Sequence, residues 1–268
     1  MSVAAGQDTI AAAFAAAATK GASSAALMPY LMGGFPDLDT SLAIGHAYAD
    51  AGADLVELGV PFSDPLADGP VIHAAGTAAL AAGATVHGVL EVGRELAEAV
   101  PVVLMCYANL VFARGAERFA DGLAARGIAG LIVPDLPLEE AGGVLAACDA
   151  AGIALVGLVA PTTPDERLAA IAPSARGFVY TVSVTGTTGE REGIASALPP
   201  ILARTKAHFD VPVAVGFGIG TPEAAAQAAA AGADGVIVGS RLVRAAGESP
   251  EPAAAVRELV ASFAEALR

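Results

Sequence analysis

The chain has few positive charges. It contains 14 lysine and arginine residues against 28 aspartate and glutamate residues, and its formal net charge is -14. Nucleic-acid binding depends on cations that neutralise phosphates, and anionic lipid surfaces attract clusters of basic residues. Neither feature is present, so the composition argues against nucleic-acid and membrane partners.

Lysine, histidine and cysteine, which often carry covalent or metal chemistry, are also scarce. Neither of the two lysines ends a predicted strand, because Lys20 precedes the first strand and Lys206 lies in the helical stretch before the seventh, so a Schiff-base mechanism lacks its nucleophile. The four histidines are dispersed, without the two-histidine-plus-carboxylate grouping of a metal site. Cys106 and Cys148 lie in apolar or helix-like stretches, as core residues of a reduced cytoplasmic protein do. We therefore expect catalysis without a metal or a covalent cofactor.

Long apolar segments are missing as well. No run approaches the roughly 18 to 20 strongly apolar residues of a membrane span. The N-terminal stretch is apolar, but Asp8 and the lack of a preceding lysine or arginine contradict a secretory signal. We expect a soluble cytoplasmic protein in which residues 8–19 form a helix.

A short pattern recurs along the chain. AGADLVELG (51–59) returns as AGADGVIVG (231–239), and RGIAGLIVP (126–134) and AGIALVGLV (151–159) are looser copies. In each copy a residue pattern that can end a helix precedes an apolar run that is typical of a buried strand. Such runs predict eight strands, at residues 27–32, 54–58, 102–107, 130–133, 154–159, 177–182, 213–217 and 235–238.

The order of these elements predicts the fold class. Continuously apolar strands separated by helical stretches indicate parallel crossover units with both faces of the sheet covered. Their number matches an α/β fold of the (β/α)8 TIM-barrel type, with residues 1–268 as a single domain. A doubly wound open sheet is the alternative, but residues 32–36 lack the nucleotide-binding fingerprint expected after its first strand. The helix at residues 8–19 is then an extra N-terminal element that could plug the barrel floor.

Two carboxylates lie where such barrels build their active sites, at strand ends and in the loops that follow. Glu57 ends the second predicted strand, where desolvation should raise its pKa and suit it to give and take protons. Asp68 follows in the long loop after that strand. Each has a simpler interpretation, Glu57 as an acid that caps a loop or pairs with an arginine and Asp68 as part of an Asp-Gly turn. Together they can act on one ligand with different pKa values.

Glycine-rich segments follow the last three predicted strands, at residues 186–189, 216–220 and 239–240. In this fold, loops at these places commonly bind phosphate through backbone N–H groups and a helix N-terminus. Glycine lets the backbone approach the anion, although glycines can also serve tight turns only. The glycine-rich loops and the two carboxylates therefore favour a phosphorylated small substrate, with acid–base carboxylates at its other end.

Several motifs resemble those of the tryptophan synthase alpha subunit family, and they keep the same order and spacing over nearly the whole chain. They are ELGVPFSDPLADGP (57–70), MCYANLVF (105–112), VPDLPLEE (133–140), FVYTVSVTGTTG (178–189), VGFGI (215–219) and VIVGS (236–240). The resemblance implies a carbon–carbon lyase of L-tryptophan biosynthesis. Its reaction would be the retro-aldol cleavage of indole-3-glycerol phosphate to indole and glyceraldehyde 3-phosphate.

The resemblance also implies roles for single residues. Glu57 matches the acid–base that protonates carbon 3 of the indole ring and helps to remove the proton of the glycerol hydroxyl. Asp68 matches the carboxylate that binds the indole N–H and stabilises the positive charge on the ring. The substrate-binding positions are Tyr30, Tyr180 and Phe217 in the indole pocket, Gly189, Gly218, Gly239 and Ser240 at the phosphate, and Thr188 in a mobile loop that closes onto Asp68. The protonated indole would be the electron sink that a metal or Schiff base usually supplies.

A partner is implied too. The family assembles with a pyridoxal-phosphate-dependent beta subunit, as an α2β2 heterotetramer, and that cofactor is expected only in the partner. Asp64 and Pro65 of the second strand's loop, with Asn109 and Phe112 after the third strand, match the docking surface.

The sequence departs from the family pattern in places, and two alternatives stay open. His73 stands where Gln is usual, residues 33–36 replace a segment ending in Gly-Asp-Pro, and Thr187 stands where Val is common. One alternative is another phosphate-binding barrel enzyme, although an indole-glycerol-phosphate synthase would need a lysine at a strand end. The other is a catalytically weak regulatory subunit that binds the phosphate ester and activates the beta subunit.

Overall fold

The strands of the protein form one parallel sheet. The computed structural model describes residues 6–21, 24–182, 191–216 and 218–268, with the side chains at 191–197 outside this description. The strands are β1 (Ala26–Met32), β2 (Val56–Gly59), β3 (Val102–Met105), β4 (Gly130–Ile132), β5 (Ala154–Leu155), β6 (Gly157–Val159), β7 (Val179–Val182), β8 (Val213–Gly216) and β9 (Gly235–Val238). The predicted strands are all present, with ends shifted by up to a few residues.

The sheet closes on itself through one strand that is interrupted. Neighbours follow the order β5-β4-β3-β2-β1-β9-β8-β7-β6, and every pairing is parallel. The two ends of this order, β5 and β6, are separated in the chain only by Val156, whose N–H donates to the Leu131 carbonyl oxygen (2.9 Å). The predicted continuous strand at 154–159 is therefore wrong in one respect, because its first half pairs with β4 and its second half with β7.

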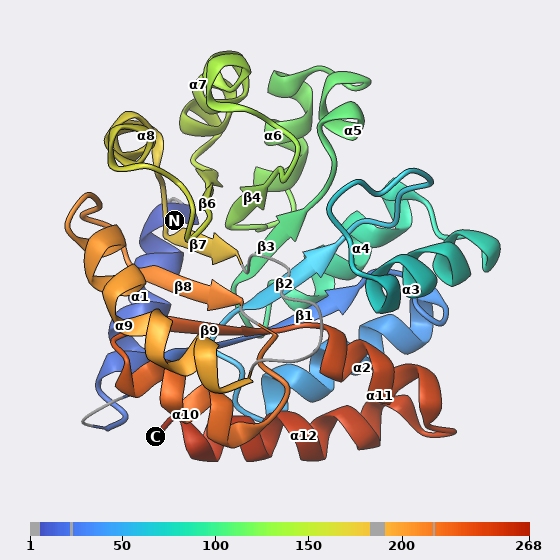
Figure 1. The fold of residues 1–268 in the computed structure, drawn as a ribbon. Coiled ribbons are helices and arrows are strands. Elements are labelled where there is room, and N and C mark those ends of the chain that lie inside the picture. Colours follow the sequence, from blue (N-terminus) through green and yellow to red (C-terminus); the bar gives the residue numbers. More distant parts are fainter. Residues whose placement is uncertain (1–5, 22–23, 183–190, 217) are drawn as a thin grey trace.

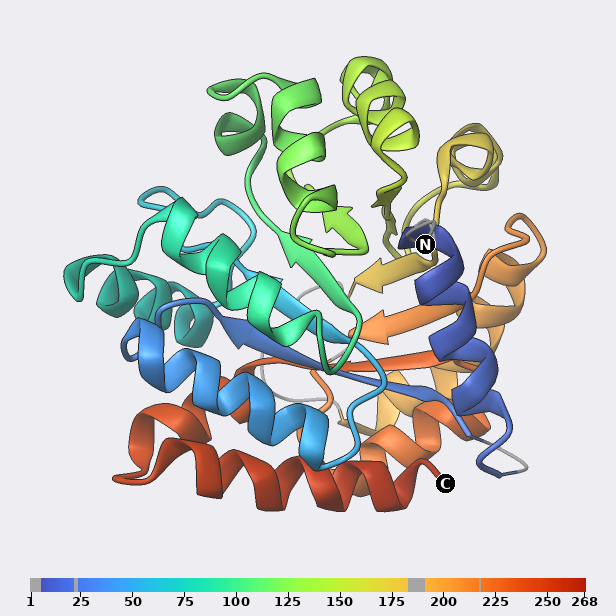
Figure 2. The ribbon, with the colours of Figure 1, turned by 180° about the vertical axis from the view of Figure 1, so that it is seen from behind.

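Helices surround this barrel on the outside, except α1, which lies across one end (Figures 1 and 2). They are α1 (Gly6–Ala18), α2 (Leu38–Asp50), α3 (Pro70–Ala81), α4 (Val86–Leu96), α5 (Ala108–Phe112), α6 (Ala116–Ala124), α7 (Gly142–Ala151), α8 (Asp165–Ile171), α9 (Arg191–Lys206), α10 (Pro222–Ala230), α11 (Ser240–Glu248) and α12 (Pro252–Ala266). Side-chain caps begin three of them: Asp37, Thr85 and Thr221 each accept the N–H of a residue three positions later. A large apolar cluster lies between the helices and the outward-facing strand residues. This (β/α)8 arrangement confirms the predicted fold class.

The N-terminal helix α1 closes the end of the barrel from which the strands start. Figure 2 shows it lying across that end, with the strands pointing away from it. Ile10 and Phe14 of α1 are buried in the apolar cluster inside the barrel, and the Phe14 ring lies 5.6 Å from that of Phe178. The strand residue Gly130 and nearby Gly177 make room, because a Cβ at either would lie about 3.1 Å from Ile10 Cδ1. The prediction that an extra helix plugs the floor is confirmed.

Both lysines lie near the plugged end and have equivalent roles. Lys20 Nζ pairs with Asp54 (2.5 Å), and Lys206 Nζ pairs with Asp234 (2.7 Å). Each carboxylate also accepts a backbone N–H at the start of a strand: Asp54 from Leu27 of β1 (2.9 Å) and Asp234 from Val213 of β8 (2.8 Å). The two aspartates occupy the same position of the repeated AGAD pattern. Each therefore holds the start of a neighbouring strand through a hydrogen bond, β1 in one copy and β8 in the other. Neither lysine reaches the opposite end of the barrel.

Across the described ranges, no single helix has both the length and the apolar character needed to cross a membrane. Helices α3 and α4 meet the criterion only when taken together, and they are bent by 108° relative to each other.

Candidate active site

A cavity of about 810 Å³ opens at the carboxyl ends of the strands. Its size is in the range of small-molecule sites. Strand residues that line it above the apolar plug include Tyr30, Glu57, Met105, Leu158, Tyr180, Gly216 and Ile237. The loops and the start of α11 add further lining residues, which include Asp68, Thr163, Gly218 and Gly239 from loops and Ser240, Arg241 and Arg244 from α11.

Glu57 is the buried acid of this cavity. Inward and outward side chains alternate along β2, so Leu55 and Glu57 face the interior while Val56 and Leu58 face the helices. The Glu57 side chain is 1% exposed, and its Oε2 has no hydrogen-bond partner within the described part of the chain. Burial, with a smaller contribution from the Asp68 charge, raises the pKa of Glu57 to about 8. The predicted direction of this pKa shift is confirmed, and the group is protonated at neutral pH.

Asp68 lines the same cavity from the loop after β2, and Tyr107 holds it. The Tyr107 hydroxyl donates to Asp68 Oδ1 (2.9 Å) and accepts the Ala67 N–H (3.0 Å). The Tyr107 ring is itself stacked on Phe62, with 5.1 Å between ring centroids. Partial burial raises the pKa of Asp68, while the hydrogen bond from Tyr107 and the charge of His73 lower it. The net effect is a raised pKa, but Asp68 is less desolvated than Glu57 and has a donor for its charged form.

Tyr30 and Tyr180 form walls of the cavity, and glycines make their positions possible. Tyr30 pairs in register with Glu57 across β1 and β2, so the two side chains share a layer of the barrel. A Cβ at Gly59 would lie 2.0 Å from the Tyr30 hydroxyl oxygen, and one at Gly216 would lie 2.4 Å from that of Tyr180. Gly216 was predicted as part of a phosphate loop, but here its missing side chain makes room for an aromatic ring.

Glycine-rich backbone forms another wall, built by the loops after β8 and β9. Gly239 precedes α11, whose first residue is Ser240, so the unpaired N–H groups of that helix end open on the cavity. Gly218 has a positive φ of 51° and no atom within 4 Å of a hypothetical Cβ. The predicted residues Gly218, Gly239 and Ser240 are therefore brought together with Glu57 and Asp68. The predicted residues Thr188, Gly189 and Phe217, and the departure at Thr187, lie outside the described residues.

The four predicted docking residues do not line the cavity. Asp64 is exposed and accepts a hydrogen bond from the Ser63 hydroxyl (2.6 Å), and Pro65 follows in the same loop. Asn109 is exposed in α5, and Phe112 at the end of that helix is 55% exposed. They belong to the loops that follow β2 and β3, on the side of the barrel where the cavity opens.

Reasoning from the sequence assigned no role to Tyr107, which holds Asp68, or to Arg241 and Arg244, which line the cavity. Tyr107 lies in the quoted MCYANLVF segment, directly after the third strand, and its position at a strand end was the available signal. Arg241 and Arg244 directly follow the Gly-Ser pair at the start of α11, and both line the cavity. Their spacing of three residues places them on one face of the helix.

In the described ranges, no group of three or more His, Cys, Asp or Glu side chains is arranged to hold a metal ion.

The chain is similar to known proteins in both sequence and fold. The family model for the tryptophan synthase alpha chain matches residues 15–267. The tryptophan synthase alpha chain of Prochlorococcus marinus is 52% identical over 221 residues, covering 82% of this chain and 80% of that protein. The alpha chain of a Picosynechococcus species is 46% identical over 252 residues, covering 92% and 96%. Among solved structures, tryptophan synthase of Mycobacterium tuberculosis has a TM-score of 0.89 at 41% identity and covers 97% of this chain and 98% of that chain.

The family model spans the barrel and the loop that carries Asp68, and the solved structure covers 97% of the chain. The chain therefore belongs to the tryptophan synthase alpha chain family, the lyases that cleave indole-3-glycerol phosphate in tryptophan biosynthesis.

Proposed function

We propose that Glu57 and Asp68 carry out the cleavage of indole-3-glycerol phosphate in the cavity at the barrel mouth. The observation that carries this proposal is the Glu57 carboxyl, which is buried, unpartnered within the described residues and protonated at neutral pH. A group in that state can donate a proton to carbon 3 of the indole ring and become a carboxylate.

Proton transfer prepares the carbon–carbon bond for cleavage. Protonation at carbon 3 places a positive charge on the indole, which Asp68 stabilises by accepting a hydrogen bond from the ring N–H. When the bond between carbon 3 and the glycerol chain breaks, its electron pair returns to the ring and neutralises it. The hydroxyl proton of the glycerol carbon passes to the Glu57 carboxylate, and that carbon becomes the aldehyde of glyceraldehyde 3-phosphate. Glu57 ends the cycle protonated, as it began.

The remaining cavity residues bind and orient the substrate. Tyr30 and Tyr180 provide the apolar walls for the indole, a role we extend to Phe217. The backbone at Gly218, Gly239 and Ser240 receives the phosphate at the start of α11. We assign Gly189 to the same phosphate site and Thr188 to a loop that closes onto Asp68. Closure would exclude water and strengthen the electrostatic effect of both carboxylates.

We also propose that the chain assembles with a tryptophan synthase beta subunit as an α2β2 heterotetramer. The solved Pyrococcus furiosus relative, with a TM-score of 0.84 at 38% identity over 90% of this chain and 98% of that chain, is an α2β2 complex with mutual activation. On this chain, the docking surface would include Asp64, Pro65, Asn109 and Phe112. The 55% exposure of Phe112 supports the assignment, and Leu66, in the same loop as Asp64, is a second exposed apolar side chain at 85%.

A cytoplasmic location fits the same proposal. Cys106 and Cys148 are both unpaired and buried, as is typical of a reducing compartment.

The proposal is tested by incubating the purified chain with indole-3-glycerol phosphate and measuring indole release, with and without an added beta subunit. We expect slow release by the chain alone and faster release in the complex. Binding of the substrate without any cleavage, even in the complex, would contradict the lyase assignment and favour a regulatory subunit.

A further inference from the structure

Two arginine residues that line the cavity have no side-chain partner among the described residues. Arg241 and Arg244 lie one turn apart at the start of α11, and both are exposed. In the part of the chain that the structure describes, neither takes part in an ion pair or a hydrogen bond. By contrast, acidic side chains contact Arg94, Arg126, Arg167, Arg176, Arg204 and Arg257.

This placement is electrostatically unfavourable unless an anion binds. The N-terminus of a helix carries a partial positive charge, which repels cations in the first turns. Arg241 and Arg244 also repel each other, because residues three apart on a helix are neighbours. A bound anion would offset both repulsions at once.

The cavity is a ligand site on independent grounds. Glu57 is 1% exposed, its Oε2 has no partner within the described ranges, and it lines the same cavity. The acidic and basic residues that line the cavity are Glu57, Asp68, Arg241 and Arg244. No ion pair joins either arginine to either carboxylate in the described structure. The arginine charges therefore remain free for an anionic group of the ligand itself.

We infer that Arg241 and Arg244 bind the phosphate group of the substrate and favour phosphate esters over uncharged analogues. This inference rests on the proposed function, in which the backbone at Gly239 and Ser240 receives that phosphate. The planar guanidinium group donates several N–H groups in a fork that matches phosphate oxygens. In a chain with a net charge of -14, two cations at the cavity also counter the repulsion that an anionic substrate meets.

The kinetic signature follows from where the reaction occurs. The phosphate group does not change during cleavage, so the arginines contact it equally in the ground state and the transition state. Such uniform binding lowers KM without raising kcat. Arg241 and Arg244 are thus binding residues and not part of the proton-transfer machinery.

The test is the double variant Arg241→Gln/Arg244→Gln, with Arg118→Gln as the matched control. Arg118 is exposed in the first turn of another helix, α6, and is absent from the cavity lining. Binding of inorganic phosphate and of glycerol 3-phosphate is measured by calorimetry at two salt concentrations, and KM and kcat are measured in the complex with a beta subunit. We expect the double variant to weaken phosphate binding and raise KM by about tenfold or more, with kcat nearly unchanged.

The control should behave like the wild type, and Arg241→Lys/Arg244→Lys should recover part of the affinity because it keeps the charges. A double variant that binds both probes within less than about tenfold of the wild type would overturn the inference. If that happens while the wild type still releases indole, only the role of the arginines is lost. If the wild type releases no indole, the proposed function fails instead, while the phosphate-binding result still decides the role of the arginines.

Discussion

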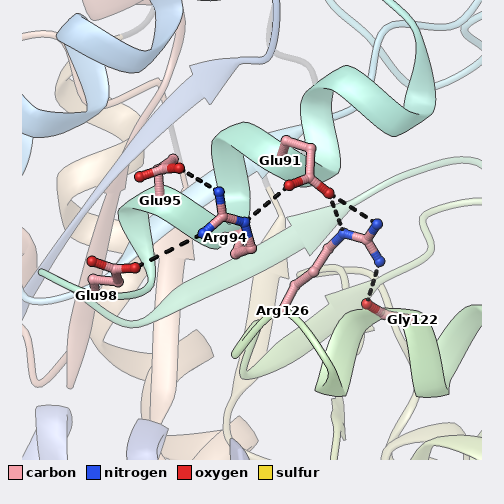
Figure 3. A network of polar contacts seen from close by, with 6 residues as sticks. All are labelled: Glu91, Arg94, Glu95, Glu98, Gly122 and Arg126. Atoms are coloured by element: carbon pink, nitrogen blue, oxygen red, sulfur yellow. Dashed lines mark hydrogen bonds and ion pairs between the residues drawn. The ribbon is translucent and has the colours of Figure 1, made fainter.

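Glu57 at the barrel mouth and Glu91 on the outer helix layer carry the same carboxyl group in opposite surroundings. Glu57 is almost completely buried beside another carboxylate and lacks a donor among the described residues. Glu91 of α4 accepts hydrogen bonds from Arg94 Nε (2.9 Å) and Arg126 Nε (3.0 Å). Figure 3 shows the resulting network, in which Arg126 also donates to the Gly122 carbonyl oxygen and so links α4 to α6.

The two surroundings shift the pKa values in opposite directions. Burial raises the pKa of Glu57 to about 8, while the hydrogen bonds from Arg94 and Arg126 lower the pKa of Glu91. Glu57 is therefore a proton donor at neutral pH, and Glu91 is a fixed anion. The comparison shows that chemical reactivity here depends on the solvent and the partners around a residue, and not on its type.

The largest effect is expected for Glu57→Gln, which keeps the size of the side chain but cannot transfer a proton. Indole release should fall at least about a hundredfold, while glycerol 3-phosphate binding is retained. Glu91→Gln is the matched control and should retain wild-type turnover. A Glu57→Gln variant with near-normal indole production would make the acid–base assignment untenable.

The pH dependence of the wild type should report the Glu57 proton. Only the protonated carboxyl can donate to the indole, and kcat/KM reflects groups of the free enzyme. We expect kcat/KM to fall above pH about 8, by about tenfold for each further unit. A flat profile across two units above this pKa would show that Glu57 does not supply the proton.

Tyr107→Phe should affect the second carboxylate. Loss of the hydroxyl removes a hydrogen bond that lowers the pKa of Asp68, so this pKa should rise and the acid limb of kcat/KM should move to higher pH. At neutral pH we expect kcat/KM to fall by about tenfold. Tyr48→Phe removes another buried hydroxyl, which donates to the Tyr30 carbonyl oxygen, and should leave the acid limb in place. An acid limb that does not move in Tyr107→Phe would contradict the assigned contact.

The pH dependence of thermal stability should also differ between Glu57 and Glu91. A folded-state pKa of about 8 against a reference of 4.5 means that the folded chain binds more protons between these values, so Glu57 lowers stability as pH rises through this window. Relative to the wild type, Glu57→Gln should therefore gain in Tm between pH 5 and pH 9, by about 3 °C or more. A constant Tm difference across this pH range would argue that Glu57 ionises as it does in the unfolded chain.

The smallest effect is expected for the stability of Glu91→Gln. Exposed ion pairs contribute little because water and salt screen them. The Tm should change by no more than about 2 °C, and less at high salt. A large loss of stability would show that the α4–α6 network has a greater role than its exposure implies.

Much of the fold could be predicted because its signals are local. Apolar runs after helix-ending patterns identified the strands, and the alanine-rich run at residues 8–19 identified the N-terminal helix. The interruption at Val156 could not be predicted, because it depends on a change of hydrogen-bonding neighbour from β4 to β7. Periodicity in the sequence does not record which strand lies on each side.

The candidate site also contains residues that the sequence could predict and residues that it could not. Glu57 could be singled out as a charge at the end of an apolar strand, and Asp68 as a carboxylate in the loop that follows it. The contact between Tyr107 and Asp68 joins residues 39 positions apart, and no sequence spacing indicates it. Arg241 and Arg244 look like ordinary surface cations of a helix until the barrel places that helix beside the cavity.

The sequence by itself determined the strands, the plug helix and the presence of two acids near one strand end, because hydrophobic pattern and residue type act over short distances. Only the tertiary structure decided that Glu57 lacks a partner among the described residues, that Asp68 has Tyr107, and that two arginines face the same cavity. Desolvation and charge act through space, so closure of the barrel was needed to bring these distant residues into one electrostatic environment.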